Sequence, residues 1–234
     1  MIYGAVAAGG TGSRMGADIP KQFLEINSVP IIIRTIRKMV EKTDRVFVGV
    51  VSEWFDYTCD LVEKFKLSEK VTVVKGGSNR METLYRIVLE IEAESLVSDE
   101  DILITHDAVR PFINNRILEE GIEKCRVFGA SGTFVPAVDT IAVSMDGATL
   151  YNVPKRENMY ITQTPQTVKL KLLKNVLEEN VCRFEEFTDV CGMLNVLGFK
   201  VGFVHGEYTN IKITNPGDLV IARGILGELN DENR

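Results

Sequence analysis

The stretch that decides the fold lies at the start of the chain and reads IYGAVAAGGTGSRMGADIPKQ, residues 2–22. Its apolar part, residues 2–8, is typical of a buried strand, and three glycines follow within four positions. Glycine lets the backbone approach a ligand closely and adopt positive φ without penalty, and N–H groups turned inward in such a loop bind anions. Because Arg14 and Lys21 add two cations, we expect this loop to bind a polyphosphate whose charge is neutralised during reaction.

Two other functions of glycine loops do not match the spacing. In a dinucleotide-binding fingerprint counted from Gly10 and Gly12, the third glycine would fall where Met15 stands. A nucleotide-binding Walker loop ends in Gly-Lys-Ser or Gly-Lys-Thr, which this stretch lacks. A plain strand-to-helix turn remains an alternative, but it leaves Arg14 and Lys21 unexplained.

The first 130 residues alternate short apolar runs with helical patterns, which is typical of a doubly wound, mostly parallel, Rossmann-like α/β sheet. The expected strands are 2–8, 46–51, 71–74 and 102–105, and the expected helices begin near residues 30, 53, 81 and 115. In such a sheet the ligands bind at the carboxyl ends of the strands. Unusual loops at 8–21, 76–80 and 106–111 each follow a strand, so we expect them to meet at one edge.

The alternation of apolar strands with helical patterns stops after residue 129. Short extended runs at 133–138, 140–144 and 150–153, with an Asp146-Gly147 turn signal, predict a β-arm that spans about 138–163 and protrudes from the core. Helices are then expected at 170–179, 189–197 and 216–229, a strand at 200–204 and an extended piece at 210–214. We expect residues 1–234 to form a single domain that carries the arm as a subdomain.

Composition narrows the functional classes. The net charge of −6 disfavours a broad nucleic-acid interface, and no run approaches the roughly 20 apolar residues of a membrane span. The four cysteines lack metal-ligand spacing and suggest buried thiols in a reducing compartment. With no basic flank or cleavage site at the start of the chain, we expect a cytoplasmic protein with no nucleic-acid or membrane partner.

The two later loops carry the other candidate residues. Gly77 and its neighbours could form a base pocket, with a hydroxyl from Ser78 or Thr83, or could be a plain turn; Arg80 could brace the loops. Asp107, at a strand end, is placed to face a metal such as Mg²⁺ or an acceptor substrate, or else to cap its loop.

Cations outside the glycine loop suggest a second phosphorylated substrate. Arg110 could pair with Asp107 or with a phosphate. Arg156 and Lys212, each by itself an ordinary solvated cation, would together with Arg14 and Lys21 provide one set of charges for a nucleotide and one for an acceptor phosphate.

Eight motifs, in order along nearly the whole chain, resemble those of the 2-C-methyl-D-erythritol 4-phosphate cytidylyltransferases of the non-mevalonate isoprenoid (MEP) pathway, and equally those of the related D-ribitol-5-phosphate cytidylyltransferases. The motifs are AAGGTGSRM (7–15), PKQ (20–22), GGSNR (76–80), HDAVRP (106–111), DT (139–140), QTPQ (163–166), TD (188–189) and NIKITNP (210–216).

The resemblance implies a nucleotidyltransferase in which an acceptor phosphate attacks the α-phosphorus of CTP and magnesium pyrophosphate leaves. The catalytic residues would be Arg14, Lys21, Arg156 and Lys212. The nucleotide-binding residues would be Ala8, Gly9, Gly10, Thr11, Gly12, Gly77, Ser78, Arg80 and Thr83. The acceptor-binding residues would be Asp107, Arg110, Thr140 and Thr188, with Asp107 also the candidate ligand of Mg²⁺. The family's β-arm reaches across a homodimer, so Thr140 and Arg156 would serve the neighbour's site.

The acceptor itself has two candidates. The seven-residue step from Arg14 to Lys21 is similar to the methylerythritol enzymes, whereas Thr83 and the segments 109–112 and 206–208 are similar to the ribitol branch. We expect 2-C-methyl-D-erythritol 4-phosphate, with ribitol 5-phosphate, which would give CDP-ribitol for cell-wall or surface polymers, as the alternative. A Rossmann-type oxidoreductase, with Glu53 on the cofactor ribose, and a binding module without turnover are remoter hypotheses.

Overall fold

A seven-stranded sheet forms the centre of the computed structural model, which describes residues 1–10 and 19–231, with only the backbone for 229–231. The strand order is β5 (Val71–Lys75), β4 (Arg45–Val50), β1 (Ile2–Ala8), β6 (Ile102–Asp107), β8 (Tyr160–Lys169), β7 (Ala130–Pro136) and β9 (Gly202–His205). All neighbours are parallel except the two pairs that contain β8. The mostly parallel α/β sheet predicted from the sequence is therefore confirmed.

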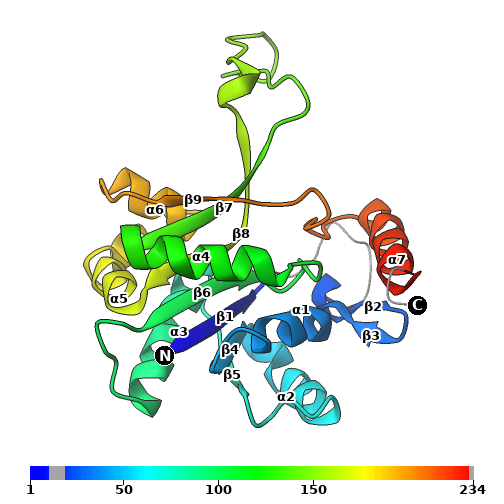
Figure 1. The fold of residues 1–234 in the computed structure, drawn as a ribbon, viewed down its shortest axis with the longest axis vertical. Coiled ribbons are helices and arrows are strands. Elements are labelled where there is room, and N and C mark those ends of the chain that lie inside the picture. Colours follow the sequence, from blue (N-terminus) through cyan, green and yellow to red (C-terminus); the bar gives the residue numbers. More distant parts are fainter. Residues whose placement is uncertain (11–18, 232–234) are drawn as a thin grey trace.

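Helices cover both faces of this sheet (Figure 1). One face packs against α1 (Ile31–Val40), α2 (Phe55–Lys64) and α4 (Asn115–Phe128). The other packs against α3 (Arg80–Glu94), α5 (Leu170–Glu179) and α6 (Val190–Val196). Side chains alternate between the faces along a strand, so Val6 and Ala5 of β1 enter opposite clusters, and both are fully buried. Burial on both faces explains why the central strands are continuous apolar runs.

A smaller cluster lies beside the sheet and was not expected. The hairpin of β2 (Glu25–Ile26) and β3 (Val29–Pro30) packs there against α7 (Pro216–Asp231) through Ile26 and Ala222. Each strand of the hairpin has only two residues, too few for a periodic pattern to be visible in the sequence. Short 3₁₀ helices η2 (Lys21–Phe23), η3 (Ser52–Trp54), η4 (Arg156–Asn158) and η5 (Val181–Glu186) complete the described part of the chain.

Local chemistry explains where the helices begin and end. The Asn79 and Asn114 side chains accept hydrogen bonds from the backbone N–H groups of Glu82 and Ile117 and so cap the starts of α3 and α4. Gly129 ends α4 with a φ of 84°, a conformation that favours glycine. The helix expected to begin near residue 115 does begin there, and the helix expected at 170–179 has those bounds in the structure.

The arm protrudes from the sheet as predicted, but its internal strands differ from the prediction (Figure 1). The expected strands 140–144 and 150–153 are irregular and share only one bridge, between Val143 and Asn152. An isolated two-stranded ribbon without a packed face is marginally stable, which explains the lack of a regular ladder. The turn at Asp146 is present, because its carboxylate accepts hydrogen bonds from the N–H groups of Ala148 and Thr149 at 2.8 Å.

The pairing at the base of the arm is also different. β7 runs from residue 130 rather than 133, and it pairs with β8 at 160–169, where no strand was expected. Polar residues and Pro165 interrupt β8, so it lacks both apolar and alternating patterns. The predicted extended piece at 210–214 is irregular in the structure.

Helix α3 approaches β4 closely at Gly49, and this contact predicts a stability difference. A Cβ at Gly49 would lie 2.4 Å from Thr83 Cγ2 and 3.1 Å from Ile87 Cδ1. We expect Gly49→Ala to lower the free energy of unfolding by about 1–3 kcal/mol, because the added methyl overpacks the interface. Gly224→Ala on exposed α7, where a Cβ would meet nothing within 4 Å, should instead raise it by about 0.5–1 kcal/mol. Denaturant titration measures both, and equal effects would contradict this account.

Candidate active site

A cavity of about 330 Å³ opens where strands β1 and β6 end. Its walls come from the glycine loop, the start of α3 and the segment after β6, as the predicted convergence of loops requires. The lining residues include Ala8, Gly9, Gly10, Lys21, Gly77, Ser78, Arg80, Thr83, Asp107 and Lys212. Ten of the residues singled out in the sequence are thus brought together.

The start of the glycine loop is held by a residue that the sequence analysis did not select. Gln22, which is buried, donates hydrogen bonds from its Nε2 to the carbonyl oxygens of Ala8 at 2.9 Å and Gly10 at 3.1 Å. The η2 turn thereby closes onto the end of β1 and sets Lys21 against the cavity, where only 9% of this residue is exposed. Thr11, Gly12 and Arg14 lie outside the described residues.

The loop before α3 is shaped by side chains of that helix. The Glu82 carboxylate accepts hydrogen bonds from both N–H and Oγ of Ser78 at 2.7 Å, and these bonds lower the pKa of Glu82 to about 2. Thr83 Oγ1 accepts from the N–H of Gly77 at 3.1 Å and donates to the carbonyl of Asn79 at 2.8 Å. Both hydroxyls expected to contact a base are therefore engaged within the loop.

Asp107 ends β6 among three cations. Arg80 Nη1 contacts its Oδ1, while Lys212 Nζ lies 3.0 Å and Arg110 Nε 3.3 Å from its Oδ2. The backbone N–H of Asp107 donates to Thr164 Oγ1 at 3.1 Å. Burial alone would raise the pKa of Asp107, but the three positive charges outweigh burial and hold the pKa well below its usual range. The carboxylate is thus a charged anchor for cations from three parts of the chain.

Arg110 contacts Asp107, which is one of the two partners expected for it. We expected it near the acceptor, yet its residue is 8% exposed, and its Nη1 donates to the carbonyl of Asn210 at 2.8 Å. Together with its contact to Asp107, this bond directs the guanidinium toward protein atoms and not toward the cavity, whose walls do not include Arg110. Arg80, by contrast, has buried Nε and Nη2 atoms without hydrogen-bond partners among the described residues and lines the cavity.

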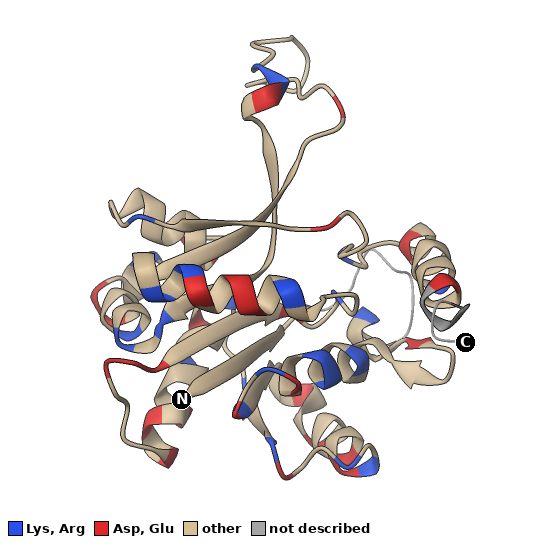
Figure 2. Cartoon of the chain, in the orientation of Figure 1, with Lys and Arg blue, Asp and Glu red and all other residues tan. Residues whose placement is uncertain are grey.

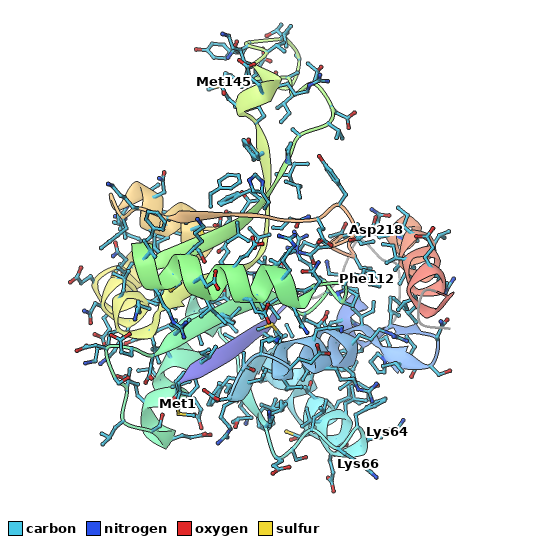
Figure 3. All side chains as sticks on the ribbon, in the orientation of Figure 1. Met1, Lys64, Lys66, Phe112, Met145 and Asp218 are labelled. Carbon is cyan, nitrogen blue, oxygen red and sulfur yellow. The ribbon has the colours of Figure 1, made fainter. Side chains whose placement is uncertain are left out.

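Three expected site residues lie away from this cavity. Thr140 and Arg156 are exposed on the arm, where Arg156 Nη1 donates to the carbonyl of Val138 at 3.2 Å. Figure 2 shows acidic and basic residues side by side on η4, and Figure 3 shows Met145 at the far end of the arm. Thr188 precedes α6 and is exposed, with its Oγ1 3.4 Å from Asp189 Oδ2.

The described residues do not fit a resident magnesium ion. No group of three or more metal-ligating Asp, Glu, His or Cys side chains occurs among them. Asp107 is a lone carboxylate whose two oxygens already contact cations, and those cations would repel a divalent ion placed beside it. The expected role of Asp107 as a metal ligand is therefore not supported by this geometry.

Comparisons with known proteins agree with the motifs. A model of the 2-C-methyl-D-erythritol 4-phosphate cytidylyltransferase family (IspD) matches residues 2–228. The chain belongs to this family. It is therefore a nucleotidyltransferase of the cytidylyltransferase class, and the oxidoreductase hypothesis loses its support.

Two solved structures named for methylerythritol cytidylyl chemistry share the fold over almost their full length. The 4-diphosphocytidyl-2C-methyl-D-erythritol synthase of Anaerococcus prevotii is 25% identical, with a TM-score of 0.81 over 97% of this chain and 96% of that one. The 2-C-methyl-D-erythritol 4-phosphate cytidylyltransferase of Francisella tularensis is also 25% identical, with a TM-score of 0.77 over 94% and 97%. Among the described residues, no helix has the length and apolar character needed to cross a membrane.

His106, next to Asp107, predicts a pH dependence of stability. It is fully buried on the opposite face of β6, its Nε2 lies 3.0 Å from the carbonyl of Arg110, and burial lowers its pKa to about 4. The ordinary pKa of a histidine side chain is 6.5, so the uncharged ring contributes stability that is fully present above pH 6.5 and is lost as the pH falls toward 4. The loss should be on the order of 3 kcal/mol.

Unfolding free energies between pH 7 and pH 4 test this expectation. The loss should be smaller in His106→Gln than in the wild type. A His106→Gln profile identical to that of the wild type would contradict the assignment.

Proposed function

We propose that the chain transfers the cytidylyl group of CTP to the phosphate of 2-C-methyl-D-erythritol 4-phosphate in the MEP pathway of isoprenoid biosynthesis. The observation that carries the proposal is the family match over residues 2–228, combined with a cavity whose cations come from three separate loops. The solved relatives from Anaerococcus and Francisella are named for methylerythritol substrates. We further propose a cytoplasmic location, where CTP is made, and a single domain over residues 1–234 with the arm as a subdomain.

The proposed reaction is an in-line displacement at phosphorus. An oxygen of the acceptor phosphate forms a bond to the α-phosphorus of CTP, the bond from that phosphorus to the bridging oxygen breaks, and pyrophosphate leaves with the electron pair. Charge develops on the oxygens around phosphorus, so the enzyme's contribution is positioning and electrostatic stabilisation.

Each wall of the cavity has a role in this proposal. Gly9 and Gly10, which line the cavity, would bind the triphosphate through their N–H groups, and Lys21, with Arg14, would stabilise the developing charge. The loop at Gly77 and Thr83 would contact the cytosine.

The acceptor would bind on the other side of the cavity. Lys212, whose side chain is 43% exposed while it contacts Asp107, would hold the acceptor phosphate. Magnesium would enter as part of the MgCTP substrate, bound through its phosphates.

We also propose that the arm completes the site of a second copy in a homodimer. Arg156 and Thr140 lie on the arm and do not line the cavity of their own chain. Large apolar side chains are exposed along the same arm, with 79% of Met145 and 72% of Tyr151 accessible. A neighbouring subunit would cover such residues, and Arg156 would then contribute to the neighbour's acceptor phosphate.

Pyrophosphate release tests the reaction and its acceptor together. With CTP and Mg²⁺, we expect turnover with 2-C-methyl-D-erythritol 4-phosphate that exceeds turnover with D-ribitol 5-phosphate. Chelation by EDTA should abolish it, and Lys21→Ala should lower kcat by about 100-fold or more. Faster pyrophosphate release with D-ribitol 5-phosphate would reverse the acceptor assignment. CTP binding without pyrophosphate release with either acceptor would contradict both acceptor assignments.

Mixing two inactive variants tests the arm. If Arg156 serves the neighbouring subunit, then a dimer of one Lys21→Ala and one Arg156→Ala chain has one intact site. Random exchange of subunits should therefore restore about a quarter of the wild-type activity from two nearly inactive preparations. Activity that does not rise on mixing, although mass measurements show that subunits have exchanged, would place Arg156 outside the neighbour's site.

A further inference from the structure

Lys212 lies on a segment without regular secondary structure. β9 ends at His205 and α7 begins at Pro216, so neither a strand nor a helix fixes the position of this lysine. Side chains on irregular segments need supporting contacts to hold a reactive geometry to within a fraction of an ångström. The contact between Lys212 and Asp107 joins side chains only. On the far side of Lys212, the N–H of Ile213 donates to the carbonyl of Val109 at 2.9 Å and holds the backbone there. The stretch before Lys212 needs support of its own.

The amide side chains of Asn210 and Gln163 supply this support, and we call the two residues the amide clamp. Asn210 is fully buried, and its Nδ2 donates to Gln163 Oε1 at 3.2 Å and to the carbonyl of Thr164 at 2.9 Å. Gln163 Nε2 donates in return to the carbonyl of Glu207 at 2.9 Å. The segment is thus tied at two points to β8, the strand that leads out of the arm.

The clamp is fitted closely to its surroundings. A Cβ at Gly206 would lie 2.5 Å from Gln163 Oε1, so only glycine lets the segment approach this close. Asn210 Oδ1 has no hydrogen-bond partner among the described residues, which leaves the Nδ2 group as the part of the side chain that holds the segment. The clamp therefore depends on an amide donor that an aliphatic side chain cannot replace.

Asn210 also connects, through its backbone carbonyl, to the cations around Asp107. The carbonyl of Asn210 accepts the hydrogen bond from Arg110 Nη1, and Arg110 Nε lies against Asp107. Thr164, whose carbonyl accepts one of the hydrogen bonds from Asn210 Nδ2, also accepts with its Oγ1 from the N–H of Asp107. Asn210 consequently links the segment that carries Lys212 to the surroundings of Asp107 and to the base of the arm.

We infer that Asn210 is a positioning residue for the acceptor side of the reaction, acting through Lys212. The inference rests on the proposed function. Asn210 itself would not contact the substrate. Through Asn210, the position of Lys212 at the acceptor phosphate would depend on β8. The nucleotide side, formed by the glycine loop and α3, shares no hydrogen bond with the clamp among the described residues.

Steady-state kinetics of Asn210→Ala tests the inference. Displacement of a reacting group by about 1 Å can cost up to about 100-fold, so kcat/KM for the acceptor should fall by roughly 10- to 100-fold. The KM for CTP should change by less than about twofold, because the clamp does not reach the nucleotide side. Gln163→Ala removes the opposite half of the clamp, so it should also lower kcat/KM for the acceptor and leave the KM for CTP nearly unchanged. This variant replaces Asn210→Ala in the test if Asn210→Ala folds poorly.

The matched control is Asn180→Ala, which removes another buried amide, at the end of α5, that donates to the carbonyl of Val176 at 2.9 Å. This variant should leave both kcat/KM for the acceptor and the KM for CTP unchanged. In the Lys212→Ala background, Asn210→Ala should cause no further loss, because it acts through that lysine. Two results would overturn the inference. One is an Asn210→Ala variant whose kcat/KM falls equally for CTP and for the acceptor. The other is an equally large fall in kcat/KM when Asn210→Ala is added to Lys212→Ala.

Hydrogen exchange of the unliganded protein separates this inference from the proposed function. Amides of residues 206–214 should exchange faster in Asn210→Ala than in the wild type, while those of residues 76–83 remain unchanged. If the wild type releases no pyrophosphate with either acceptor, the proposed function fails. Hydrogen exchange then still tests whether Asn210 holds the segment 206–214 in place. Unchanged exchange in residues 206–214 would overturn the clamp whatever the activity.

Discussion

A buried carboxylate stays ionised only if nearby positive charges or hydrogen bonds offset the loss of its hydration, and Asp107 has three cations from three parts of the chain around it. Arg80 comes from the start of α3, Arg110 from the loop after β6, and Lys212 from the segment between β9 and α7. Removing the carboxylate would leave these charges close together in a partly buried place, where their repulsion is poorly screened. The placement of these three cations therefore depends on one side chain at the end of one strand.

The fold provides this convergence before any ligand is present. Parallel strands end at one edge of the sheet, and alternation along β6 directs Asp107 toward α3 while His106 enters the opposite face. Gln22 and Glu82 then shape the loops on either side through hydrogen bonds to backbone groups. The cations and the loop backbone are thus preorganised, which is the main contribution an enzyme makes to phosphoryl transfer.

The sequence predicted the sheet, most helices and ten cavity residues, because apolar periodicity and glycine loops are local signals. It did not predict strand β8, whose partners lie far away in the chain, or the buried amides of Gln22, Gln163 and Asn210. Polar residues of this kind look like surface residues until tertiary contacts bury them; only their position within the PKQ, QTPQ and NIKIT motifs could have singled them out. For Arg110 the sequence left two partners open, Asp107 or a phosphate, and the structure shows its contact with Asp107.

A crystal structure with CTP, Mg²⁺ and the acceptor phosphate tests the role of the Asp107 cluster most directly. The account predicts that the triphosphate lies against Gly9, Gly10 and Lys21, and that Asp107 keeps its contacts with Arg80 and Lys212 while the magnesium ion is bound by phosphate oxygens. An Asp107 carboxylate that leaves these cations and coordinates the magnesium ion directly would contradict it.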